Sequence, residues 1–209
     1  MNPRTRVKIC GITRPEDASE AARLGVDAIG LVFYEKSPRH VSIEQAQRIC
    51  QALTGFVTVV ALFMNPPSEQ VSQVLDQVPV DLLQFHGVEN AEFCRSFERP
   101  YIKALGISGS KDLLSQIEPY TDARGILLDS HATGAAGGTG ETFDWSLIPD
   151  QLRGSIILAG GLNPANVAEA ISRVHPYAVD LSSGVESAPG IKDSALMTQL
   201  INEVKRVDC

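Results

Sequence analysis

Eight short apolar runs rich in β-branched residues alternate with helix-like segments along the whole chain, and no other feature limits the possible folds so strongly. The runs are RVKICG, AIGLVF, VTVVALFM, LLQFHG, YIKALGI, GILLDS, SIILAGG and AVDLSSG. This alternation is typical of repeated βα units around a parallel sheet. Division of the 209 residues among eight units leaves about 26 residues for each, close to the ~30 of a compact βα unit.

We therefore predict an α/β fold in which parallel strands close into a single (β/α)8 TIM barrel, with residues 1–209 forming one domain. A doubly wound open sheet is the structural alternative. It would place a glycine-rich fingerprint directly after the first strand, whereas the first run continues into CGIT. Helices are expected over residues 15–25, 42–53, 68–78, 90–98, 111–120, 145–152, 163–174 and 192–206.

The charge balance argues against nucleic acid as a partner. The chain has 18 Lys and Arg against 25 Asp and Glu, a net charge of −7, whereas a nucleic-acid surface needs a clustered basic excess. No run approaches the ~20 apolar residues of a membrane span, and the N-terminus has no apolar stretch of signal-peptide length. We expect no membrane association and a cytoplasmic location.

The four cysteines are Cys10, Cys50, Cys94 and Cys209, and they are widely scattered. They show neither CxxC nor Cys/His ligand spacing, so we expect no disulfide framework and no metal site. Cys50, Cys94 and Cys209 fall on expected helices or the tail, which leaves Cys10 as the candidate for chemistry.

Glycine and serine close the last two apolar runs, where barrels commonly bind phosphate. Gly160 and Gly161 follow the seventh run, and Ser182, Ser183 and Gly184 follow the eighth. Glycine allows the backbone amides to approach an anion closely, and a serine hydroxyl adds a donor. These five residues are our predicted phosphate site; the alternative is that the two glycines only turn the chain.

A glycine-rich stretch around Gly138 follows the sixth run. Long βα loops of this kind are used to enclose substrates. We predict that Gly138 belongs to such a loop and contacts the substrate, with a plain surface loop as the alternative.

Cys10 ends the first run on the same expected face as Lys8, because side chains alternate along a strand. A charged Lys8 is tolerable inside a barrel only if it is paired, and Asp180 on the neighbouring eighth strand is the expected partner. A nearby cation favours the thiolate, so we expect a lowered pKa for the Cys10 thiol. The alternative is a small buried apolar residue without a chemical role.

Three further polar residues stand at or just after strand ends: Asp129, His86 and Arg39. Asp129 closes an apolar run that would not normally end in a carboxylate unless it faced the barrel mouth, although it would also cap the following loop. His86 is a candidate ligand or acid, or simply a rim histidine. The planar fork of Arg39 suits a carboxylate, although a lone arginine in a charged loop is usually only solvated.

Several segments together resemble the phosphoribosylanthranilate isomerase family, and the resemblance runs through essentially the whole chain. The segments are KICGIT (8–13), GLVF (30–33) with SPR (37–39), QFHG (84–87), LLD (127–129), GGTG (137–140) with FDW (143–145), GGLNP (160–164) and VDLSSGVE (179–186).

The resemblance implies an Amadori rearrangement of N-(5-phosphoribosyl)anthranilate to 1-(2-carboxyphenylamino)-1-deoxyribulose 5-phosphate, a step of tryptophan biosynthesis. It implies that Cys10 is the general base of this reaction and that Asp129 is its general acid. It implies that Arg39 holds the anthranilate carboxylate and that the loops after the seventh and eighth strands hold the phosphate. We further expect His86 and Asp180 to contact the substrate. The reaction needs no metal and no cofactor, because an iminium formed from the substrate is itself an electron sink.

Other readings of the sequence remain open at this stage. A ribulose-phosphate epimerase would need two histidines and two aspartates at strand ends, and an indole-glycerol-phosphate synthase would need lysines and a glutamate there. A non-catalytic phosphate-binding barrel would need no converging acid and base. The sequence leaves monomer and homodimer as equal possibilities.

Overall fold

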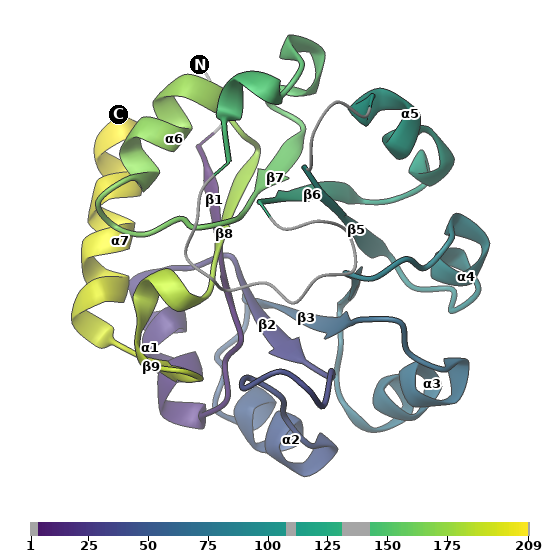
Figure 1. Ribbon diagram of the computed structural model, residues 1–209. Helices are drawn as coiled ribbons and strands as arrows, with labels where there is room; N and C mark the ends of the chain where they lie inside the picture. The colour runs from purple at the N-terminus through teal and green to yellow at the C-terminus, as the bar shows by residue number, and fades with distance from the viewer. Residues whose placement is uncertain (1–3, 108–111, 131–142, 209) are drawn as a thin grey trace.

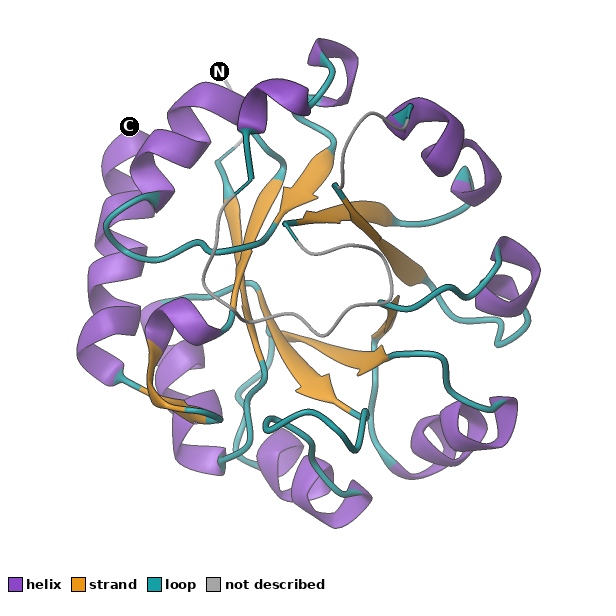
Figure 2. Ribbon diagram, in the orientation of Figure 1, coloured by secondary structure: helices purple, strands orange, loops and turns teal. Residues whose placement is uncertain are grey.

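Eight parallel strands close into a barrel in the computed structural model, with β8 hydrogen-bonded back to β1. Helices form an outer ring around the strands (Figures 1 and 2). The structure describes residues 4–107, 112–130 and 143–208. The strands are β1 Arg6–Cys10, β2 Ala28–Val32, β3 Thr58–Phe63, β4 Leu82–Phe85, β5 Tyr101–Gly106, β6 Gly125–Asp129, β7 Ile156–Leu158 and β8 Ala178–Leu181. The predicted barrel is confirmed, and each strand coincides with one apolar run.

The α-helices follow the expected segments, with local signals at their starts. They are α1 Pro15–Leu24, α2 Ile43–Gln51, α3 Ser68–Gln77, α4 Ala91–Arg95, α5 Leu113–Ile117, α6 Val167–Val174 and α7 Ser194–Val207. Pro15 occupies the first turn of α1, where its missing N–H costs nothing, and Ser42 with Gln45 forms a capping box at α2. Among the described residues, no helix is long and apolar enough to cross a bilayer.

The helix expected over residues 145–152 is wrong in type. Two short 3-10 helices stand there, η2 Trp145–Leu147 and η3 Asp150–Leu152, with Pro149 between them. Proline has no amide hydrogen and its ring excludes the preceding turn, so a continuous α-helix cannot pass through this point.

The chain after β8 also differs from a simple βα unit. A 3-10 turn, η4 Ser183–Val185, leads into an antiparallel hairpin of β9 Glu186–Ala188 and β10 Ile191–Lys192 before α7 begins. Figure 1 shows this hairpin lying beside α1. It was not expected from the sequence, because its two strands are too short for an alternating pattern to stand out.

The strand register decides which side chains face the barrel interior. Lys8 on β1 pairs in register with Asp180 on β8 and with Ala28 on β2, and Cys10 pairs with Gly30. Residues in register on parallel strands point to the same face, so Lys8, Cys10 and Asp180 share the interior. The outward face carries the main core, in which large buried side chains such as Phe63 and Phe85 pack against the helices.

One ion pair is buried between the strands and the helix layer. Lys103 Nζ lies 2.8 Å from Glu89 Oε2 and 2.7 Å from the Gly87 carbonyl oxygen. The side chain of Lys103 is 1% exposed and that of Glu89 is 3% exposed. Glu89 Oε1 also accepts hydrogen bonds from the amides of Asn65 and Gly87. The pair therefore holds the chain just after His86 against β5.

We expect Glu89→Gln to lower the free energy of unfolding by about 3 kcal/mol, because it leaves the Lys103 ammonium buried without its counterion. Urea denaturation followed by circular dichroism measures this. Glu20→Gln is the matched control, since it breaks a bidentate Arg–Glu pair on the exposed face of α1 and should change stability little. A loss of less than about 1 kcal/mol for Glu89→Gln would contradict the argument.

Candidate active site

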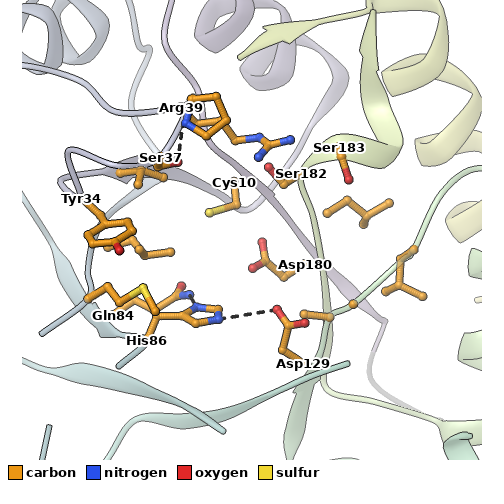
Figure 3. A pocket seen from close by; sticks show the side chains of 18 of the residues that line it. Cys10, Tyr34, Ser37, Arg39, Gln84, His86, Asp129, Asp180, Ser182 and Ser183 are labelled. Atoms are coloured by element: carbon orange, nitrogen blue, oxygen red, sulfur yellow. Dashed lines mark hydrogen bonds and ion pairs between the residues drawn. The ribbon is translucent and has the colours of Figure 1, made fainter. Parts of the chain in front are cut away.

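A pocket opens at the carboxyl ends of the barrel strands, where barrel enzymes carry their chemistry. Figure 3 shows Cys10 and Asp180 near its centre, with Arg39, Ser182 and Ser183 above them and with His86 and Asp129 facing each other below. Tyr34 and Gln84 lie on the left. The lining residues are Cys10, Val32, Tyr34, Lys36, Ser37, Pro38, Arg39, Leu62, Met64, Gln84, His86, Asp129, Ala159, Gly160, Gly161, Leu162, Asp180, Leu181, Ser182 and Ser183.

Lys8 forms the floor of this site with Asp180. Its Nζ lies 2.9 Å from both carboxylate oxygens of Asp180, and both side chains are buried, which confirms the expected pair. Burial alone would lower the pKa of Lys8, but the Asp180 carboxylate and the Cys10 thiol raise it above its ordinary value. Lys8 is therefore an ammonium ion held in a fixed position beneath the pocket.

The Cys10 side chain fits because residue 30 is a glycine. A β-carbon at Gly30 would lie 2.7 Å from the Cys10 sulfur and 3.2 Å from Lys8 Nζ. Real β-carbons essentially never show the first distance, and the second is tight, so Gly30 keeps open the space in which the thiol and the ammonium lie.

The expected lowering of the thiol pKa is wrong. Burial raises the pKa of Cys10 above its ordinary value, because desolvation penalises the thiolate more than Lys8 and Lys192 favour it. Asp180 adds to this rise, because its negative charge disfavours a second negative charge on the nearby sulfur.

His86 faces Asp129 across the pocket. His86 Nε2 lies 3.6 Å from Asp129 Oδ2, and its Nδ1 lies 3.3 Å from Gln84 Nε2 (Figure 3). Burial lowers the pKa of His86 below its ordinary value although Asp129 opposes the shift, so the ring is neutral near pH 7. With the Gln84 amide as donor, Nδ1 accepts and the ring proton lies on Nε2, toward Asp129.

Arg39 reaches the pocket from the loop after β2 and is held by a carboxylate of the hairpin. Its Nε and Nη2 donate to the two carboxylate oxygens of Glu186 at 2.8 and 2.7 Å. Lys192 Nζ donates to Glu186 Oε1 at 2.7 Å and to the Ser182 carbonyl at 3.1 Å. Two cations therefore share one buried carboxylate at this edge of the site.

The loops after β7 and β8 touch each other closely. Gly160 and Gly161 have φ of 85° and 63°, in the left-handed region that favours glycine. A β-carbon at Gly184 would collide with the Leu162 carbonyl oxygen, so the two loops approach more closely there than any side chain allows. The Ser182 hydroxyl is buried without a hydrogen-bond partner in the described part of the chain, and it lines the pocket as an available donor.

The structure brings together nine of the eleven residues proposed from the sequence: Cys10, Arg39, His86, Asp129, Gly160, Gly161, Asp180, Ser182 and Ser183. Gly184 packs behind the pocket against the loop after β7. Gly138 and the expected loop around it lie outside the described residues.

Sequence reasoning missed Gln84, Glu186 and Lys192. Gln84 stands two residues before His86, and side chains two residues apart on a strand point to the same face. This spacing predicts that Gln84 faces the pocket together with His86. Glu186 ends one of the segments that carry the family resemblance, but its meeting with Lys192 depends on the hairpin and has no local signal.

Comparison with known proteins identifies the relatives of this chain. A family model described as N-(5'phosphoribosyl)anthranilate (PRA) isomerase matches residues 7–203. The N-(5'-phosphoribosyl)anthranilate isomerase of Pseudomonas fluorescens (strain Pf0-1) is 54% identical over 200 residues, which cover 96% of this chain and 98% of that protein. The chain belongs to this isomerase family.

Solved structures of the isomerase family have the same barrel. The phosphoribosyl anthranilate isomerase of Thermotoga maritima matches with a TM-score of 0.87 at 42% identity, covering 97% of this chain and 99% of that one. A phosphoribosyl anthranilate isomerase in complex with reduced 1-(o-carboxyphenylamino)-1-deoxyribulose 5-phosphate matches with a TM-score of 0.84, also at 42% identity and with the same coverage.

We expect the rate of Cys10 alkylation by iodoacetamide to rise with pH, because only the thiolate reacts. The midpoint of this rise should lie above the ordinary thiol pKa, because burial raises the pKa of Cys10. Peptide mass spectrometry separates Cys10 from Cys50, whose pKa burial raises to about 11, and from Cys94, raised to about 12. A midpoint below the ordinary value would show that the cations, not burial, control the thiol.

Proposed function

We propose that the protein converts N-(5-phosphoribosyl)anthranilate to 1-(2-carboxyphenylamino)-1-deoxyribulose 5-phosphate by acid/base catalysis, as the phosphoribosylanthranilate isomerase of tryptophan biosynthesis. The convergence of Cys10 and Asp129 on one pocket carries this proposal. Family membership and the solved complex of a relative with a reduced product analogue support it. A non-catalytic phosphate-binding barrel would have no need for this convergence.

The first step in this mechanism is opening of the sugar ring. Protonated Asp129, at the end of β6, would donate its proton to the furanose oxygen, and the C1–O bond would break to give an iminium ion. The neutral ring of His86 lies beside the Asp129 carboxyl group and would orient it. General acid catalysis of this kind typically contributes 10²–10⁴-fold to the rate.

The second step is removal of the C2 proton by the Cys10 thiolate. The iminium ion withdraws electrons from C2, so the proton becomes acidic without a metal or cofactor. The same positive charge would counteract the burial that raises the Cys10 pKa. The base would therefore become competent when its substrate is activated, and the resulting enolamine would relax to the ketone.

The two charged ends of the substrate would be held away from the reacting bond. We propose that Gly160, Gly161, Ser182, Ser183 and Gly184 bind the phosphate through the two contacting loops after β7 and β8. Barrels commonly bind phosphate at these loops, with backbone amides at the start of a short helix.

The remaining contacts follow from the same pose. Arg39 would hold the anthranilate carboxylate at its own edge of the pocket, and Asp180 would approach the sugar from the floor between Cys10 and Asp129. We also propose that Gly138 contacts the substrate from the loop after β6.

We propose that residues 1–209 act as one catalytic domain in the cytoplasm, as a monomer or a homodimer. The Thermotoga maritima relative is named as dimeric, in a structure of monomers generated from it. Sedimentation of the protein would distinguish the two states.

A fluorescence assay for loss of N-(5-phosphoribosyl)anthranilate tests the reaction, and two variants test the residue roles. We expect Cys10→Ser to slow turnover by about 10²–10⁴, since an alcohol is hardly ionised, and Asp129→Asn to slow it by a similar factor or more. Both variants should still bind the reduced product analogue.

A preformed open-chain substrate analogue separates the two roles. It bypasses ring opening, so it should partly rescue Asp129→Asn and leave Cys10→Ser impaired. Equal rescue of both variants, or near-normal turnover by either, would mean that the assignment of base and acid is wrong.

We also expect inorganic phosphate to inhibit competitively, because the two loops should accept a free dianion. Gly184→Ala should weaken this inhibition, since its β-carbon would meet the Leu162 carbonyl oxygen and push the loops apart. Inhibition that does not compete with the substrate, or that is unchanged in Gly184→Ala, would place the phosphate elsewhere.

A further inference from the structure

Glu186 is a buried carboxylate at the edge of the pocket to which the acid/base chemistry gives no role. Its side chain is 4% exposed and lies between Arg39 and Lys192, the side chain of Lys192 being 0% exposed. Burial raises the pKa of Glu186, but Arg39 and Lys192 together lower it below its ordinary value. The carboxylate is therefore charged, and it accepts three charge-assisted hydrogen bonds from two different elements of the fold.

The contact with Arg39 uses only one edge of the guanidinium group. Nε and Nη2 donate to Glu186, which leaves one proton of Nη1 and the second proton of Nη2 side by side on the neighbouring Nη1/Nη2 edge. Among the described residues, Glu186 alone is hydrogen-bonded to the side chain of Arg39, and Arg39 lines the pocket. The unused edge has the bidentate geometry that fits a second carboxylate.

The charges of this cluster do not cancel. Arg39 and Lys192 are two cationic groups on the single carboxylate of Glu186, and burial lowers the pKa of Lys192 below its ordinary value although Glu186 opposes the shift. A buried surplus of one positive charge is costly unless an anion completes it. One carboxylate on a bound molecule would supply that charge.

We propose that Glu186 is a positioning residue, which fixes the Arg39 guanidinium so that its second edge receives the carboxylate on the substrate's aromatic ring. This inference rests on the proposed function, in which Arg39 binds that carboxylate. Lys192 completes the arrangement by linking Glu186 to the Ser182 carbonyl, in the loop proposed to bind phosphate.

The β9–β10 hairpin makes this arrangement rigid. It places Glu186 and Lys192 on paired strands, in register with each other. The Lys192 amide donates to Asp17 Oδ2, and Asp17 is held in turn by Arg14 at 2.6 and 2.9 Å. The hairpin is thereby anchored to α1, so the Glu186 carboxylate has a fixed position from which to orient Arg39.

The test compares two ligands in Arg39→Ala, in Glu186→Gln and in the double variant. The ligands are reduced 1-(o-carboxyphenylamino)-1-deoxyribulose 5-phosphate and the matching phenylamino compound without the carboxylate, with Kd measured by calorimetry. We expect Glu186→Gln to weaken binding of the first ligand about tenfold or more and to leave the second nearly unchanged. In the Arg39→Ala background the added Glu186→Gln change should have little further effect, because Glu186 acts through Arg39.

The kinetic expectation follows the same logic. Glu186→Gln should raise KM about tenfold with kcat little changed, since a carboxylate remote from C1 and C2 is bound alike in the ground and transition states. Glu20→Gln, which removes one partner of an exposed bidentate Arg–Glu pair on α1, is the matched control and should leave both Kd values unchanged.

The binding measurements distinguish the ways in which this inference could be wrong. Equal weakening of both ligands by Glu186→Gln, or additive losses in the double variant, would show a merely structural role and overturn the inference. If Arg39→Ala left the Kd of the first ligand unchanged, the carboxylate site would lie elsewhere, and this inference would fall with it. If the unaltered protein bound neither ligand, the proposed function itself would be overturned.

Discussion

The ion pair between Lys8 and Asp180 lies at the seam where the last strand meets the first, and the geometry of the pocket depends on it. A buried ammonium ion is stable only beside its counterion, so β1 and β8 must close in the register that sets these two residues opposite each other. A shift of one residue would turn every side chain of β1 to the other face. The same register brings Cys10 into the barrel mouth, where Gly30 leaves room for it.

Every buried cation around the pocket shares a protein carboxylate. Lys8 has Asp180, while Arg39 and Lys192 divide Glu186 between them. Asp180 thus opposes Lys8 at the Cys10 sulfur, and desolvation outweighs the cations there, so the thiol pKa is raised. In the proposed reaction, the iminium ion would be a positive charge near the thiol without a protein carboxylate beside it. Its formation would therefore favour the thiolate, so proton abstraction would follow ring opening.

Two different kinds of interaction form the outer edge of the site. The β7 and β8 loops depend on glycine, because their backbones approach closer than a side chain permits. The edge that carries Arg39 depends on ion pairs. The β9–β10 hairpin, which lies between β8 and α7, supplies Glu186 and Lys192 for them. Lys192 joins the two through the Ser182 carbonyl. In the proposed pose, the two ends of the substrate are thus held by connected parts of the fold.

The sequence by itself determined the barrel and nine of the residues that line the pocket, because both follow from local patterns. Apolar runs predict strands, and polar residues and glycines that close those runs lie at the barrel mouth. It failed over residues 145–152 and at the hairpin, where Pro149 and very short strands break the pattern. Only the tertiary structure decided the state of Cys10 and the partner of Arg39. Glu186 is 147 residues from Arg39 and Asp180 is 172 from Lys8, and burial and charge act through space, whatever the separation along the chain.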